Sequence, residues 1–239
     1  MKVAVMQPYF FPYIGYWQLH YFADIWVILD EVQFKQFSWM RRNRILHQDV
    51  REQYQYISLP VLKHGQKTPI NRVKINNDRP WRDEVMRQLA VYEKFNTVNY
   101  SDVTRLVKEI IDRDNRSLTE LMMNTFDGVN QYLGLKTECR VSSNLDFERS
   151  DITAPDEWAL FITKALGGAH YINPPGGREI YDRSKFESRN VKLSFLVPEL
   201  REYSQNRDNF VPGLSIIDVL MFNGVTGVRR MLANEFEIE

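Results

Sequence analysis

The chain has 239 residues, of which 44% are hydrophobic and 13% aromatic, enough to build a sizeable core. Its 31 Lys and Arg residues balance its 31 Asp and Glu residues, so no overall field attracts nucleic acid or an anionic membrane. The apolar start is interrupted at Gln7 and Pro8, too early for a signal peptide, and no apolar run approaches the roughly 18 residues of a membrane-spanning helix. We expect a cytoplasmic protein with no nucleic-acid partner and no membrane insertion.

The cysteine and histidine content argues against a metal site. The one cysteine, Cys139, cannot form an internal disulfide or a multi-thiolate site, and no two of the four histidines have the i, i+4 spacing of a helical metal site. We therefore predict no metal and no other cofactor. Cys139 could be an acyl-accepting nucleophile with Arg140 lowering its pKa, but a lone cysteine on a strand is more often a small buried residue.

The first thirty residues have the pattern of a strand, a helix and a strand. KVAVM is a short apolar run that ends before Pro8, and apolar residues recur at helical spacing from Tyr13 to Ala23. Ile25 to Leu29 then form a continuous apolar run, which is typical of a strand buried on both faces. The pattern predicts a βαβ unit and hence an α/β fold with a Rossmann-like core.

The middle of the chain predicts one strand and then three helices. An extended segment is expected at 53–60, followed by helices over 78–94, 101–114 and 117–134, the last with a Ser117 and Glu120 capping box and a C-cap at Gly134. We expect a helical subdomain, about 78–135, inserted in a single domain spanning 1–239.

The C-terminal third returns to mixed helices and strands. Strands are expected at 170–173 and 192–197, in the same sheet as the first two strands, and an apolar helix is expected from Ser215 to about Gly224. This alternation supports the α/β prediction.

The sequence from Met6 to Asn43, MQPYFFPYIGYWQLHYFADIWVILDEVQFKQFSWMRRN, resembles the WbqC-like family of bacterial proteins. The resemblance continues in YINPPGGREIYD, in Tyr203 with Gln205, and in FVPGLSIIDVLMFNG, so it covers nearly the whole chain. Members of this family occur with enzymes that make O-antigen and other surface polysaccharides. The resemblance therefore implies a role in lipopolysaccharide biosynthesis, as a cytoplasmic transferase acting on an activated amino sugar, but it assigns no catalytic residue.

A second likeness concerns PYIGY at residues 12–16. Nucleotidylyltransferases and class I aminoacyl-tRNA synthetases carry a His-x-Gly-His turn at this point, where nucleotide phosphates meet the helix N-terminus. Here Tyr13 and Tyr16 stand in place of the histidines and Gly15 is kept. Tyrosine donates a hydrogen bond but carries no positive charge at neutral pH, so the likeness predicts nucleotide binding without adenylation chemistry.

Polar side chains that follow the first two strands are candidate site residues, because α/β sheets bind ligands at the carboxyl edge. Gln7, Tyr9 and Tyr13 follow the first strand, and Asp30 and Gln33 follow the second. The alternatives are core packing for the tyrosines, which we expect for Trp17 and Phe22, and an ordinary turn for Asp30.

Two further segments predict anion binding. SWMRRNRI forms a polar loop whose guanidinium groups could bind phosphate; solvated surface arginines are the alternative. The loop contains Trp39, Arg41, Arg42, Asn43 and Arg44, and the resemblance to the WbqC-like family favours Trp39, Arg42 and Asn43 over Arg41 and Arg44. HYINPPGGREIYD could present backbone N–H groups to an anion, or it could simply turn the chain.

These observations lead to one functional hypothesis and one alternative. The protein is predicted to transfer an acyl or aminoacyl group from a carrier to the amine of a nucleotide-linked amino sugar, with Asp30, Gln33 and Tyr13 as catalytic residues. The predicted substrate-binding residues are Gln7, Tyr9, Gly15, Tyr16, Trp39, Arg42, Asn43, His170, Asn173, Gly176, Gly177 and Tyr181. The alternative is a non-catalytic nucleotide- or sugar-binding scaffold of a polysaccharide assembly complex.

Overall fold

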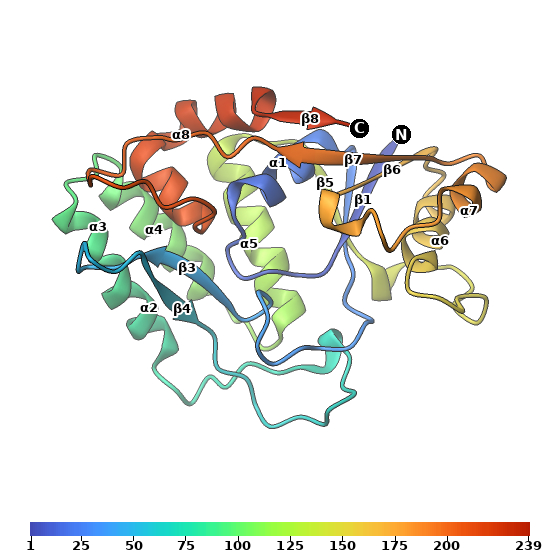
Figure 1. The fold of residues 1–239 in the computed structure, drawn as a ribbon. Helices are drawn as coiled ribbons and strands as arrows, with labels where there is room; N and C mark the ends of the chain where they lie inside the picture. The colour runs from blue at the N-terminus through green and yellow to red at the C-terminus, as the bar shows by residue number, and fades with distance from the viewer.

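A computed structural model describes all 239 residues and shows a six-stranded sheet with helices on both faces (Figure 1). The strands are β1 (Lys2–Met6), β2 (Ile25–Ile28), β5 (Glu138–Val141), β6 (His170–Asn173), β7 (Lys192–Pro198) and β8 (Phe236–Ile238). Their order is β5-β2-β1-β6-β7-β8, and all neighbours are parallel except β7 and β8. The mainly parallel sheet confirms the predicted Rossmann-like α/β class and the prediction that β6 and β7 join the same sheet as β1 and β2.

Each face of the sheet packs against its own set of helices. Val3 and Val5 of β1 face α6 (Glu157–Ala165) and α7 (Arg183–Ser188), while Ala4 faces the larger core on the other side. That larger core contains α1 (Ile14–Phe22), α4 (Tyr100–Ile111), α5 (Leu118–Leu133) and α8 (Ile216–Asn234). Since both faces are covered, the central strands read as continuous apolar runs.

The helices of the middle segment begin and end close to the predicted residues. They comprise α2 (Trp81–Leu89), α3 (Val91–Lys94), α4 and α5. The capping box at α5 is confirmed, with the Glu120 N–H donating to Ser117 Oγ, and Gly134 is the left-handed C-cap at φ 62°. These helices share one hydrophobic core with α1 and α8. The division into a main domain and an insertion stays a prediction. None of the helices combines the length and the apolar character needed to cross a bilayer.

The polar loop predicted around Arg42 is wrong, because this segment forms a strand. β3 (Arg42–Leu46) pairs antiparallel with β4 (Tyr54–Ser58), which lies within the predicted 53–60 segment. Asn43 points inward with only 4% of its surface exposed, and its amide donates to the carbonyls of Phe10 and Phe11. A buried asparagine between two arginines hides the two-residue alternation of a strand.

The last helix also differs from the prediction. α8 begins next to Ser215 as expected, and Ser215 caps it, since its hydroxyl accepts from the Ile217 N–H. Gly224 does not end the helix but kinks it, with φ 60°, and the chain continues helically to Asn234. A Cβ at Gly224 would lie 2.8 Å from the side chain of Asn99, so the kink makes room for that asparagine. Short 3₁₀ turns occur at Ile70–Arg72, Ser142–Asn144 and Pro175–Gly177.

The connections around β1 create a crevice at one edge of the sheet. The chain leaves β1 through α1 towards β2, whereas it leaves β6, on the other side of β1, through α7 towards β7. The two connections therefore diverge between the carboxyl ends of β1 and β6. This divergence is the topological switch point of the sheet, where open α/β sheets bind their ligands.

Candidate functional site

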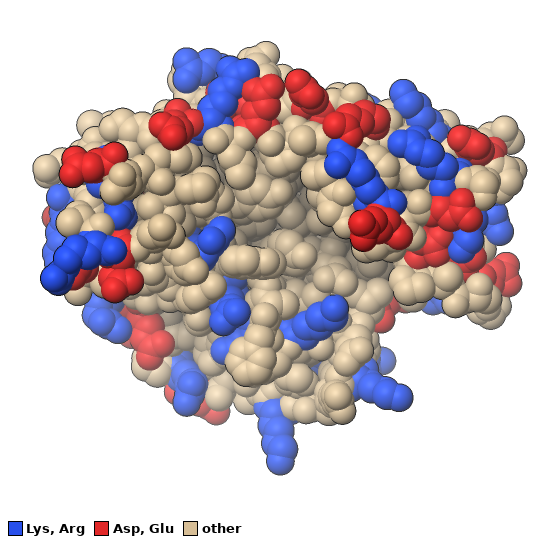
Figure 2. Space-filling view, in the orientation of Figure 1, with Lys and Arg blue, Asp and Glu red and all other residues tan.

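A cavity of about 920 Å³ opens at the carboxyl ends of β1, β2 and β6. Figure 2 shows the hollow near the middle of one face of the molecule. The principal side chains and glycines of its wall are Met6, Gln7, Tyr9, Tyr13, Leu29, Glu31, Gln33, Lys35, Trp39, Trp158, Asn173, Gly176, Gly177 and Tyr181. The cavity thus gathers most of the predicted site residues from three separate segments.

The loop between β1 and α1 divides its aromatic rings between core and cavity. Phe10 and Phe11 are buried, and Tyr9 and Tyr13 line the cavity. Phe11 has φ 43°, and this unusual turn is held by Asn43 and by Ser215, whose hydroxyl donates to the Phe11 carbonyl. The loop that presents the two tyrosines is therefore anchored from β3 and from the start of α8.

Tyr9 and Tyr13 offer neutral hydroxyl groups to a ligand. Burial raises the pKa of each phenol, and no hydrogen bond within the protein contributes to either shift. The rings of Tyr9 and Tyr16 lie 5.3 Å apart between centroids. At neutral pH both hydroxyls stay protonated and can donate to an incoming oxygen.

Aromatic rings cover the N-terminus of α1. Tyr16 is 1% exposed and its hydroxyl donates to the Gln7 carbonyl at 2.6 Å, so it reaches the cavity only as part of the supporting wall. The Tyr13 ring folds over Gly15, where a Cβ would lie 2.5 Å from a ring carbon. Gly15 thus makes room for Tyr13 and does not itself line the cavity.

Asp30 lies outside the cavity in a buried hydrogen-bond cluster. Its carboxylate accepts from the hydroxyls of Ser142, Ser143 and Thr119 and from the Ser143 N–H, at 2.9 to 3.3 Å, and the residue is 1% exposed. These bonds join the end of β2 to the turn after β5 and to α5. The arrangement gives Asp30 a structural role.

The acidic residue that does line the cavity is the next one, Glu31. Arg149 donates from Nε to Glu31 Oε1 at 2.5 Å and also bonds the carbonyls of Ser142 and Leu145. Gln33 lines the cavity as predicted, but its side-chain amide donates to the Gln66 carbonyl at 2.8 Å.

The segment after β6 contributes a compact polar turn. Asn173 Oδ1 accepts from the Tyr171 hydroxyl at 2.8 Å, and the Tyr171 and Tyr181 hydroxyls are 2.9 Å apart. A Cβ at Gly177 would lie 2.0 Å from Asn173 Nδ2, whereas a Cβ at Gly176 would meet nothing within 4 Å. Only Gly177 is required by the packing of the turn.

This contrast gives a test with a built-in control. Gly177→Ala is expected to displace Asn173 and Tyr181 and to lower the free energy of unfolding by about 1 to 3 kcal/mol, as overpacking typically does. Gly176→Ala should change it by less than about 0.5 kcal/mol, the usual range for a surface substitution. Denaturant unfolding of both variants measures the difference. Equal stabilities would mean that the turn adapts to a side chain at Gly177.

His170 lies at the opposite edge of the sheet from the cavity. It is the first residue of β6 and pairs in register with Lys2 and Lys192. Burial, followed by the charge of Lys192, lowers the pKa of its imidazole. The structure therefore separates His170 from Asn173, Gly176, Gly177 and Tyr181, the predicted residues of this motif that line the cavity.

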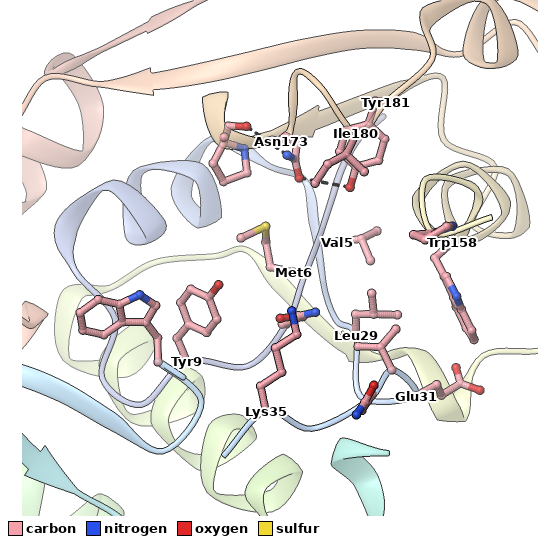
Figure 3. Close-up of a pocket in the computed structure, with 18 of the residues that line it drawn as sticks. Val5, Met6, Tyr9, Leu29, Glu31, Lys35, Trp158, Asn173, Ile180 and Tyr181 are labelled. Carbon is pink, nitrogen blue, oxygen red and sulfur yellow. Dashed lines mark hydrogen bonds between the residues drawn. The ribbon is translucent and has the colours of Figure 1, made fainter. Parts of the chain in front are cut away.

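Several cavity residues, among them Glu31, Lys35 and Trp158, were missed in the sequence. Lys35 comes from the loop after β2, and Figure 3 shows its side chain extending into the open space below Met6. Trp158 comes from α6 on the far wall. Arg42, the predicted phosphate ligand, instead lies over the Tyr56 ring at 4.5 Å and does not line the cavity.

Cys139 is not placed to act as a nucleophile. It lies on β5 against Asn130, and burial raises the pKa of its thiol to about 12. A thiol with such a pKa is protonated at neutral pH, so its nucleophilic form is scarce.

Comparison with known proteins places these features in a family. The sequence model of the WbqC-like protein family matches residues 7–230, which contain every cavity side chain from Gln7 to Tyr181. The chain is also 26% identical over 224 residues, 93% of each chain, to the "Uncharacterized protein Rv1507c" of Mycobacterium tuberculosis (strain ATCC 25618 / H37Rv). No solved structure matches it. The match over nearly the whole length shows that the chain belongs to the WbqC-like protein family.

Proposed function

We propose that the cavity binds a nucleotide-linked amino sugar and that the protein transfers an acyl or aminoacyl group to its amine. The observation that carries the proposal is the cavity itself, about 920 Å³ at the topological switch point of a Rossmann-like sheet. Sites of several hundred Å³ with apolar walls and a few polar groups are typical of small-molecule binding. The resemblance to polysaccharide-associated proteins favours a sugar substrate.

Recognition would use the aromatic walls and the single free cation of the cavity. Tyr9, Trp39 and Trp158 offer rings against which a base or a sugar can pack. Lys35 takes the role of diphosphate ligand that the sequence analysis gave to Arg42, since it lines the cavity and makes no ion pair. The Gly176 backbone is open to a second contact.

The chemistry requires a proton acceptor and a donor to the developing oxyanion. In the transfer, the neutral amine attacks the acyl carbon, a C–N bond forms, the bond to the carrier breaks and the amine loses a proton. We assign the proton acceptor to Glu31 in place of Asp30, because Glu31 is the carboxylate at the cavity wall. The neutral Tyr13 hydroxyl is the available donor, since the Gln33 amide is engaged with Gln66.

A non-catalytic binding role is the second candidate, and one observation favours it. The Glu31 carboxylate already accepts from Arg149, Nε to Oε1 at 2.5 Å, so one of its oxygens is occupied by a protein contact and is not free to meet a substrate amine. Mass spectrometry of amino-sugar nucleotides incubated with acyl and aminoacyl donors separates the two candidates. An enzyme forms an N-acylated product, and Glu31→Gln lowers its kcat; a binding protein binds the nucleotide sugar and leaves it unchanged.

Lys35 provides the test of substrate binding. Lys35→Ala is expected to weaken binding of a UDP- or dTDP-linked amino sugar about ten- to a hundredfold, because a charge-assisted contact contributes roughly 1.5 to 3 kcal/mol. Arg42→Ala is the matched control, since Arg42 lies outside the cavity and should leave the affinity unchanged. Calorimetry measures both. Loss of affinity in Arg42→Ala with none in Lys35→Ala would return the phosphate site to Arg42.

A further inference from the structure

A smaller lobe of about 220 Å³ adjoins the main cavity. The two spaces share Tyr9, Tyr13 and Trp39 in their walls, and the lobe adds Arg44 and Gly213. One water molecule occupies ~30 Å³ in the liquid, so the lobe has room for about seven waters. It is therefore large enough for a small acid or a phosphate group and too small for a nucleotide.

Arg44 is fixed at the lobe by contacts on several sides. Its guanidinium carbon lies 5.3 Å from the Trp39 ring centroid and 4.9 Å from that of Tyr54, and Nη2 donates to the Gly213 carbonyl at 3.0 Å. Gly213 has φ 65°, and a Cβ there would lie 3.2 Å from Arg44 Nη2. The glycine thus allows the carbonyl to approach the guanidinium, and the planar group is held before any ligand arrives.

The charge and hydrogen bonding of Arg44 are not satisfied within the protein. Its Nε is buried with no hydrogen-bond partner, which is uncommon for a polar atom, and the guanidinium makes one hydrogen bond to the protein. Across both spaces the one acidic side chain in the wall is Glu31, which pairs with Arg149. Lys35 and Arg44 therefore remain as two uncompensated cations in a chain of zero net charge.

We propose that the Arg44 lobe is a second anion subsite that takes a small oxyanion, a carboxylate or a phosphate. The ligand of the joined cavity then carries two separate anionic groups, one near Lys35 and one near Arg44, on either side of the Tyr9, Tyr13 and Trp39 partition. This extends the proposed function, because the group near Lys35 is the nucleotide diphosphate. The group in the lobe belongs to the second substrate or to the far end of the first.

The test uses inorganic phosphate and acetate as probes, each titrated by calorimetry at an ionic strength held constant with chloride. At least one probe should bind the wild-type protein, and the one that binds identifies the preferred oxyanion. Arg44→Gln is expected to weaken that binding at least tenfold, as loss of a charge-assisted contact does. Arg42→Gln removes the same charge from the same hairpin outside both spaces and should leave the binding unchanged.

A variant that preserves the fold tests whether probe binding is lost only because the protein unfolds. Arg44→Lys keeps the charge but loses the planar guanidinium, and it should weaken probe binding while circular dichroism stays native. Probe binding that is lost in Lys35→Ala and kept in Arg44→Gln would overturn the proposal, as would a wild-type protein that binds neither probe. The proposed function fails separately, through absence of nucleotide-sugar binding, and that result leaves the probe titrations interpretable.

Discussion

Replacing Asp30 with alanine is expected to lower the free energy of unfolding by about 3 kcal/mol, because several buried donors lose their shared acceptor and a buried donor left unsatisfied costs about 1 to 3 kcal/mol. The four donors to this carboxylate come from α5 and from the turn after β5, so they would lose a shared acceptor at once. The Ser143 N–H is affected most, because a backbone donor cannot rotate to find another partner.

Asp30→Asn separates the structural role from the catalytic one. The amide keeps one acceptor oxygen, and the serine and threonine hydroxyls can rotate to accept from its nitrogen, so we expect a smaller loss of about 1 to 2 kcal/mol. Denaturant unfolding of both variants measures whether Asp30→Ala loses more stability than Asp30→Asn. A protein with Asp30→Asn that keeps wild-type stability and loses turnover would support the catalytic role that the sequence analysis gave to Asp30.

The fold was predictable where local pattern and burial agree. The apolar runs of β1 and β2, the helical spacing of α1 and the caps at Ser117 and Gly134 each depend on short-range chemistry, and each is found where predicted. Strand β3 of the hairpin was missed because its inward-facing Asn43 satisfies its amide with distant carbonyls of the β1–α1 loop. Such a tertiary contact leaves no periodic pattern in the sequence.

The site was predictable as a sheet edge but not as individual side chains. Asp30 and Glu31 are adjacent, and β2 is a continuous apolar run without alternation, so no periodic pattern tells which of the two turns towards the cavity. His170 and Asn173 belong to one motif but lie at opposite ends of β6, roughly 10 Å apart at 3.3 Å per residue. Lys35 comes from an irregular loop, where side-chain direction depends on tertiary contacts.

Two buried titratable groups should give the protein opposing responses to pH. Asp218 on α8 is 0% exposed and accepts from Tyr203, Tyr92 and Gln205, yet desolvation raises its pKa to about 6. His20 on α1 donates from Nε2–H to Asn130 Oδ1 at 2.7 Å, and burial lowers its pKa to about 4. Both groups are therefore favoured in their neutral forms in the folded protein.

The two shifts act with opposite sign over the same pH range. Between about pH 4 and 6 folded Asp218 keeps a proton that the unfolded chain has lost, so its contribution to stability is complete below about pH 4 and is lost as pH rises through 6. Folded His20 lacks a proton that the unfolded chain binds, so its contribution is complete above about pH 6.5 and is lost as pH falls to 4. Each shift is equivalent to about 3 kcal/mol, so the two slopes nearly cancel.

Single substitutions should reveal how each group makes the free energy of unfolding depend on pH. In Asp218→Asn the free energy of unfolding is expected to rise by about 3 kcal/mol or more from pH 4 to 6.5, because Asp218 no longer opposes His20, and the lowered pKa of His170 acts in the same direction as that of His20. In His20→Gln it should fall over the same range, because the Asp218 term remains and is opposed only by the lowered pKa of His170. Denaturant unfolding at intervals of half a pH unit measures both, and comparing slopes removes any uniform loss of stability in a variant. Parallel slopes in the two variants would show that neither buried group controls the pH response. Glu157 cannot supply these slopes, because its pKa is lowered to about 2 and its contribution to stability changes only below pH 4.5.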